Sequence, residues 1–122
     1  MGHERSEMDD PELQRMTARL EALASPQRLR IFRLLVEHEP EGLVSGGVAE
    51  RLEQPHNAVS FHLKSLQHAG LVTVQREGRY QRYRADMPQV RGLLSYLTEN
   101  CCGGTVSCGT AIPMLINPEN SC

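Results

Sequence analysis

Cysteine is concentrated at one end of the chain, and thiol chemistry is expected there. All four cysteines follow residue 100, at Cys101, Cys102, Cys108 and Cys122. Thiolates are soft ligands for soft metals and metalloids, and neighbouring thiols can also form a disulfide. The first three cysteines lie close together, whereas Cys122 stands apart and is expected to be a bystander. The spacing alone leaves open a metal site, a redox pair and inert thiols.

Composition sets the class of protein in which these thiols act. Neither a secretory signal nor an apolar window long enough for a membrane span is present, so a cytoplasmic protein with no membrane partner is expected. In a reducing compartment, clustered cysteines are more often metal-binding or redox-active than structural. The 122 residues are 39% hydrophobic and 4% aromatic, and tryptophan is absent. One domain with an aliphatic core of packed helices is therefore expected.

A second chemical signal lies in residues 55–74. Val59, Leu63 and Leu66 form an apolar stripe at helical spacing, ahead of Gly70, a residue suited to ending a helix. The opposite face carries amide, hydroxyl, aromatic and cationic groups without any acid, at Asn57, Ser60, Phe61, Lys64 and His68. A helix with such an outer face, followed at once by a strand, is typical of a DNA reader.

The charge distribution supports this interpretation. The net charge is −2, but residues 1–24 carry −3 and residues 54–84 carry +4. A localised basic segment suits contact with DNA phosphates. The candidate DNA-binding residues are His56, Asn57, Ser60, Phe61, Lys64, Arg76, Arg79 and Arg82. His62 leans toward the apolar stripe and is expected to be structural, and Arg84 is expected to be a solvated strand end.

Two capping signals predict the helices that come first. Asp9 or Asp10 before Pro11 suits an N-cap followed by a first-turn proline, and Ser25 before Pro26 repeats the signal. The first helix is predicted to carry a narrow apolar stripe of Leu13, Met16, Leu20 and Leu23, flanked by Arg15, Arg19 and Glu21. This helix could pack on its own domain or on a second subunit. The second helix is apolar around much of its surface and is predicted to be the central core helix.

The middle of the chain predicts a helix-turn-helix followed by a hairpin. Ser45 is the expected cap of a short helix over 46–52, and the helix over 55–69 follows after a tight turn. Residues 71–76 and 79–84 read as two strands around the turn Glu77-Gly78, which form a wing. A last helix opens at residues 86–88 and continues to about residue 98.

Three segments of the chain resemble the ArsR/SmtB family of metal-responsive repressors. They are Ala24-Ser25-Pro26-Gln27-Arg28-Leu29-Arg30-Ile31, Val59-Ser60-Phe61-His62-Leu63 and Ala69-Gly70-Leu71-Val72. The resemblance covers residues 10–98. It implies a homodimeric winged helix-turn-helix, mainly α with a small β-hairpin, in the order α-α-α-α-β-β-α. It also implies operator DNA as a partner, an inducer that ends the binding, and first and last helices that form the dimer interface.

The resemblance divides the chain into three parts and suggests where the inducer binds. Residues 1–8 are expected to be a flexible N-terminus, residues 9–100 the DNA-binding and dimerisation domain, and residues 101–122 a cysteine-bearing inducer tail. The Cys-x-Cys motif of well-known arsenic sensors is missing from residues 48–52, and the last helix lacks the Asp/His set of some zinc sensors. The cysteines after the last helix are similar to a relocated site, which implies As(III), or Sb(III), bound by Cys101, Cys102 and Cys108.

The sequence therefore predicts a DNA-binding transcriptional repressor that releases its operator when As(III) binds cysteine thiolates. A thiol-based redox switch on the same scaffold is the main alternative, and a cadmium, lead or zinc sensor with a fourth ligand is another. An enzyme is not expected, since no Ser/His/Asp order, carboxylate pair or phosphate-cradling glycine loop is present.

Overall fold

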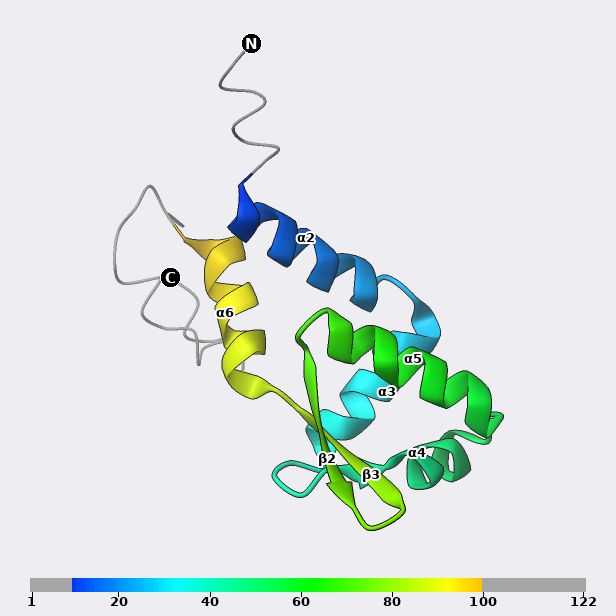
Figure 1. Cartoon of the computed structure of the whole chain (residues 1–122). Coiled ribbons are helices and arrows are strands. Elements are labelled where there is room, and N and C mark those ends of the chain that lie inside the picture. The colour runs from blue at the N-terminus through cyan, green and yellow to red at the C-terminus, as the bar shows by residue number, and fades with distance from the viewer. Residues whose placement is uncertain (1–9, 100–122) are drawn as a thin grey trace, which may run out of the picture. The chain divides into compact units, whose positions relative to one another are not determined.

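A computed structural model describes residues 10–99, in two units that meet at Met87 and Pro88. The first contains α2 (Pro11–Leu23), α3 (Pro26–Glu37), β1 (Leu43–Val44), α4 (Ser45–Leu52), α5 (His56–His68), β2 (Val72–Glu77) and β3 (Tyr80–Ala85) (Figure 1). Nearly all of α6 (Met87–Thr98) belongs to the second. The predicted mainly α fold with a small hairpin is confirmed, and no helix within residues 10–99 is long and apolar enough to cross a membrane.

Both predicted capping signals operate as expected. The Asp10 carboxylate accepts the Glu12 N–H at 3.1 Å, and Pro11 takes the first helical position of α2. The Ser25 hydroxyl accepts the Arg28 N–H at 3.4 Å ahead of α3. Each cap satisfies a backbone donor that the first turn of a helix leaves unpaired.

The buried face of α2 differs from the predicted stripe. Met16, Arg19 and Ala22 are buried, whereas Leu20 is 42% exposed. The face that packs is turned toward α5, which lies beside α2 (Figure 1). Leu20 therefore does not pack within the described chain, and the carbonyl at the end of α5 binds Arg19 at this point.

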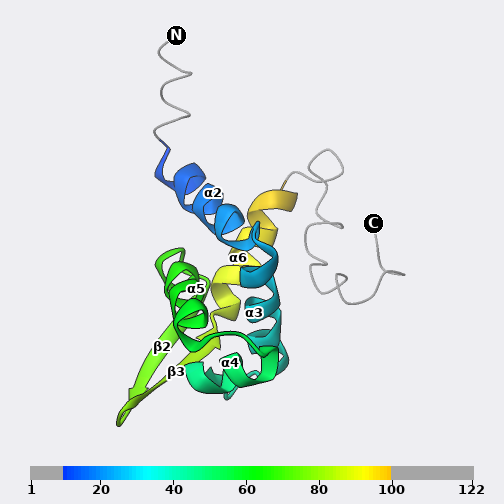
Figure 2. The ribbon, with the colours of Figure 1, turned by 90° about the vertical axis from the view of Figure 1, so that its right-hand side faces the viewer.

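The core lies where α3, α4 and α5 meet the inner face of the sheet (Figure 2). Its most deeply buried side chains come from all of these elements: Ile31, Leu35, Val48, Val59, Leu63, Leu66, Leu71 and Tyr83. The predicted stripe of α5 is confirmed, since Val59, Leu63 and Leu66 have no exposed surface. Leu29 of α3 is 41% exposed, so part of the apolar surface of α3 is left uncovered within the described residues.

The sheet is antiparallel and has the strand order β1-β3-β2. Val72 pairs with Ala85 and Glu77 with Tyr80, so the turn is Gly78-Arg79, one residue later than predicted. Gly78 has a φ of +63°, a conformation that glycine adopts without a steric penalty. The short strand β1 pairs with β3 and was not predicted, because two residues are too few to show an alternating pattern.

Candidate nucleic-acid interface

The outer face of α5 carries most of the predicted DNA-binding residues. Asn57, Phe61 and Lys64 are exposed, and Ser60 is half-buried. Phe61 is 64% exposed, although a phenyl ring loses favourable burial energy by staying in water. The structure thus brings four predicted residues to one accessible face, on the side opposite the core.

The turn before α5 fixes where this face begins. Glu53 has a left-handed φ of 54°, and the Gln54 N–H donates to the Ala49 carbonyl at 3.0 Å, which ends α4 abruptly. Pro55, with a ψ of 140°, precedes the helix rather than occupying its first turn, so α5 begins one residue later than predicted. Two helices joined by so short a turn are held at a fixed angle.

His56 and Asn57 are already engaged at the start of α5. The His56 ring lies 3.1 Å from the Ser45 hydroxyl, measured from Nε2 to Oγ. Ser45 is therefore not the expected cap of α4: it is the first residue of that helix, and its hydroxyl joins α4 to α5. The Asn57 Oδ1 accepts the Ala58 N–H at 3.0 Å. This bond holds the amide group at the helix start.

The wing separates the predicted arginines into two groups. Arg76 and Arg79 are exposed at the turn end of the hairpin. The Arg82 Nε lies 3.0 Å and 3.1 Å from the two Glu77 carboxylate oxygens, and its Nη1 donates to the Gly42 carbonyl at 3.4 Å. Arg82 thus links the turn end of β2 to the loop before β1, while Arg76 and Arg79 are exposed.

Arg84 also differs from its expected role as a solvated strand end. It is half-buried, and its Nε donates to the Pro40 carbonyl at 3.0 Å. Its Nη1 donates to the Gln75 Oε1 at 2.7 Å. These bonds tie β3 to the loop before β1 and to β2, contacts that alternation along one strand does not reveal.

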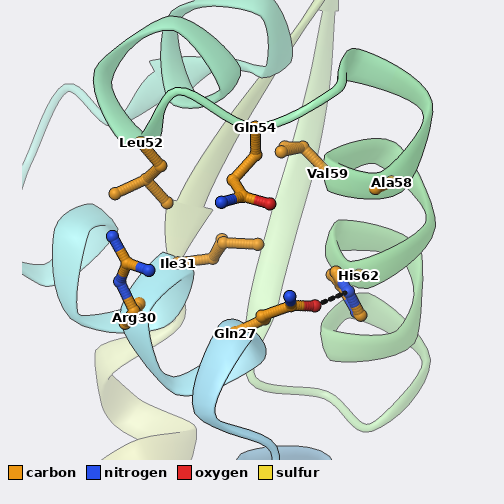
Figure 3. A pocket seen from close by; sticks show the side chains of 8 residues that line it. All are labelled: Gln27, Arg30, Ile31, Leu52, Gln54, Ala58, Val59 and His62. Carbon is orange, nitrogen blue, oxygen red and sulfur yellow. Dashed lines mark hydrogen bonds between the residues drawn. The ribbon is translucent and has the colours of Figure 1, made fainter.

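His62 lies on the flank of α5 that faces α3 (Figure 3). Its Nε2 is 2.9 Å from the Gln27 Oε1, and its Nδ1 is buried without a hydrogen-bond partner among the described residues. Burial, assisted by the nearby Arg28 cation, lowers the pKa of His62 below its usual value of 6.5. The structural role predicted for His62 fits this placement.

The cavity beside His62 is too small for an organic ligand. Its lining comes from α3, α5 and the end of the α4 segment: Gln27, Arg30, Ile31, Leu52, Gln54, Ala58, Val59 and His62 (Figure 3). Its volume suits about one water molecule. Gln27 was not predicted to matter, because its partner lies 35 residues away in the sequence.

The predicted metal ligands Cys101, Cys102 and Cys108 lie outside the described residues, as does Cys122. Between residues 10 and 99, no three histidine, cysteine or acidic side chains are grouped closely enough to hold a metal ion. The expected inducer site therefore stays a prediction.

Comparison with known proteins places these observations in context. Residues 23–75 match the model of a family described as a helix-turn-helix domain. The crystal structure of a "possible transcriptional regulator for arsenical resistance" is 34% identical, with a TM-score of 0.53 over 66% of this chain and 83% of that one.

Two further structures share the fold. HlyU from Vibrio cholerae N16961 is 28% identical and has a TM-score of 0.60 over 76% of this chain and 98% of its own. The homodimeric winged helix-turn-helix DNA-binding domain of a possible ArsR-family transcriptional regulator from Mycobacterium bovis is 26% identical. Its TM-score is 0.58, over 72% of this chain and 82% of that domain.

Proposed function

Because the chain belongs to the ArsR family of winged helix-turn-helix transcriptional regulators, we propose that it is a homodimeric repressor that As(III) removes from its operator. The observation that carries the DNA-binding part is the outer face of α5. Its polar, aromatic and cationic side chains are accessible, while the opposite face is fully buried in the core.

In this proposal α5 enters the major groove. The Asn57 amide and the Ser60 hydroxyl read base edges, and Lys64 contacts a phosphate. The Phe61 ring meets a thymine methyl group or a sugar, which accounts for an aromatic side chain left in water. His56, whose ring is held by Ser45, lies beside Asn57 at the start of α5 and contacts the backbone of the duplex.

The wing contacts the flanking DNA. Arg76 and Arg79 are exposed at its tip and reach phosphates or the minor groove. Arg82 has to give up its ion pair with Glu77 before it can contact DNA, so its contribution is smaller. Two copies of α5, about 34 Å apart in a dimer, would fit successive major grooves of a near-palindromic operator. The homodimeric M. bovis domain supports this assembly.

The DNA contacts are tested by their salt dependence. Lys64→Gln should weaken binding to the duplex that the wild-type chain selects from a random library, and lower the salt slope by about two, one for each subunit of the dimer. Phe61→Ala should weaken binding without changing the slope, because no charge is removed. Arg15→Gln, on the exposed surface of α2, is the matched control. Fluorescence anisotropy over a salt series measures all three, and unchanged binding by both α5 variants would refute the placement.

The proposed inducer is As(III), bound by Cys101, Cys102 and Cys108. Thiolates are soft ligands that suit the metalloid, and each thiol that binds arsenous acid displaces one hydroxide as water. The solved relative whose title names arsenical resistance supports this choice over other soft ions. Sb(III) is expected to act in the same way.

A titration of the protein–operator complex tests the inducer. Under reducing conditions, arsenite should release the wild type and Cys122→Ser but not Cys102→Ser. Normal release of Cys102→Ser would refute the site. Release by mild peroxide but not by arsenite would favour the redox switch, and release by Zn²⁺, Cd²⁺ or Pb²⁺ alone would favour a metal sensor with a fourth ligand.

A further inference from the structure

Arg19 is a cation in an unusual position, because its side chain is only 7% exposed on the face of α2 that meets α5. Its Nε donates to the Ala69 carbonyl at 3.0 Å, and its Nη1 lies 3.8 Å from the Met16 sulfur. Among the described residues, no carboxylate lies within ion-pair distance of the guanidinium. A buried charge is costly unless something compensates it, so the surroundings of Arg19 must do so.

The end of α5 provides that compensation. The Leu71 N–H donates to the Leu66 carbonyl, and the Gly70 N–H to the Gln67 carbonyl, which is the Schellman arrangement. The Ala69 carbonyl accepts from Arg19 instead. The carbonyl end of a helix carries partial negative charge, which favours a cation placed against it.

Gly70 makes room for the guanidinium. It has a φ of +84°, and a Cβ atom there would lie only 3.0 Å from the Arg19 Nη2. The arginine therefore packs flat against a residue that has no side chain. The hydrogen bond from Arg19 to Ala69 spans 50 residues of sequence and joins α2 to the C-cap residue of α5.

We propose that Arg19 is a positioning residue that fixes the orientation of α5 relative to α2, and so sets which half-site spacing the dimer accepts. This inference rests on the proposed function, in which α5 of a homodimer reads DNA, and on the dimer interface through the first helix that the family resemblance implies. The start of α5 is held by α4 through Ser45 and His56, and its end by α2 through Arg19. Val59, Leu63 and Leu66 keep the middle of α5 in the core, so loss of the Arg19 bond changes the angle of the helix without detaching it.

A purely stabilising cap would behave differently. It would change the fraction of folded protein, and with it the affinity for every duplex alike. An orienting contact changes the ratio between duplexes that differ only in the distance between half-sites. That ratio is insensitive to the amount of folded protein.

The experiment uses the full chain with Arg19→Met, which keeps the apolar stem, and Arg19→Lys, which keeps the charge and a donor group but not the planar guanidinium. Arg15→Met, one turn earlier on α2 and exposed, is the matched control for the lost charge. The probes are the duplex selected by the wild-type chain from a random library, the same duplex with one base pair inserted between half-sites, and a duplex with a single half-site. Anisotropy titrations give the affinities.

Arg19→Met should reduce the preference for the selected spacing over the inserted one, by about two- to thirtyfold. Arg19→Lys should restore part of the preference, and Arg15→Met should leave it at the wild-type value. An unchanged ratio in both Arg19 variants would overturn the inference. Failure of the wild-type chain to select any duplex would instead overturn the proposed function, so the two failures are distinct.

Discussion

His62 joins the reading helix to α3 through a single hydrogen bond, and its protonation state affects that contact. With the Gln27 Oε1 as acceptor, the ring proton lies on Nε2, and the buried Nδ1 keeps its lone pair. A second proton on Nδ1 would have no acceptor among the described residues and would lie near the Arg28 cation. The fold therefore favours the neutral ring over the protonated one.

This placement predicts a pH-dependent stability. Because the pKa of His62 is lower in the folded state than its usual 6.5, the unfolded chain binds more protons between those two values. The free energy of unfolding should therefore fall as the pH drops through about 6.5, and the fall should end below the folded pKa. Urea titrations between about pH 7.5 and about pH 5.5 measure the effect.

Two variants separate His62 from the other titrating groups. His62→Gln should flatten this part of the pH profile. The control His68→Gln, at the exposed end of the same helix, should retain the wild-type slope. An equally steep profile in His62→Gln would show that a different group is responsible.

At the scale of elements, the wing depends on how the loop before β1 approaches β3. Gly42 has a φ of +72°, and its N–H donates to the His38 carbonyl at 2.8 Å. A Cβ atom there would collide with the Tyr83 carbonyl oxygen and contact the Arg84 side chain. The register of Leu43 with Tyr83 is thus possible only because the preceding residue is a glycine.

Gly42→Ala should destabilise the fold by about 1–3 kcal/mol, because alanine strains the left-handed backbone and pushes the loop off β3. Gly46→Ala is the matched control. Gly46 lies in the first turn of α4 with nothing within 4 Å of an added Cβ, so the change should be neutral or stabilise by up to about 1 kcal/mol. Denaturant unfolding compares the two, and equal stabilities would contradict the close approach.

At the scale of the whole molecule, the proposed inducer site and α5 lie in different parts of the sequence. The described residues place the reading face on α5, and the cysteines follow residue 100. Release of DNA by the metalloid then requires two states of the dimer with different affinities for both ligands. Such coupling is reciprocal by thermodynamic necessity.

We expect the operator to weaken As(III) binding by the same factor by which As(III) weakens operator binding, typically about 5- to 150-fold. Calorimetry with free protein and with the preformed operator complex gives the first factor. Anisotropy with and without saturating arsenite gives the second. Two factors that differ beyond experimental error would show that release does not follow from a simple linkage.

Local signals were enough to predict much of this fold. The caps at Asp10 and Ser25 act within three residues, and the α5 stripe repeats within one helix, so both can be read from the sequence. Arg19 was expected to flank the apolar stripe of α2 and is instead buried, because its partner is a carbonyl 50 residues away. The helical period was enough to predict which residues lie on the outer face of α5. The bond from Arg82 to Gly42 could not be predicted in this way, because it joins residues that only the tertiary structure brings together.

The strand order has a consequence for how the protein behaves away from DNA. With β3 in the centre, β2 is an edge strand six residues long and has one neighbour within the described chain. An uncovered edge of that length can pair with the same edge of another molecule and begin aggregation. Arg76 and Glu77, exposed at the end of β2, place charge on this edge. The charged residues of the wing, which is proposed to bind phosphates, therefore also oppose strand pairing between the β2 edges of two free molecules.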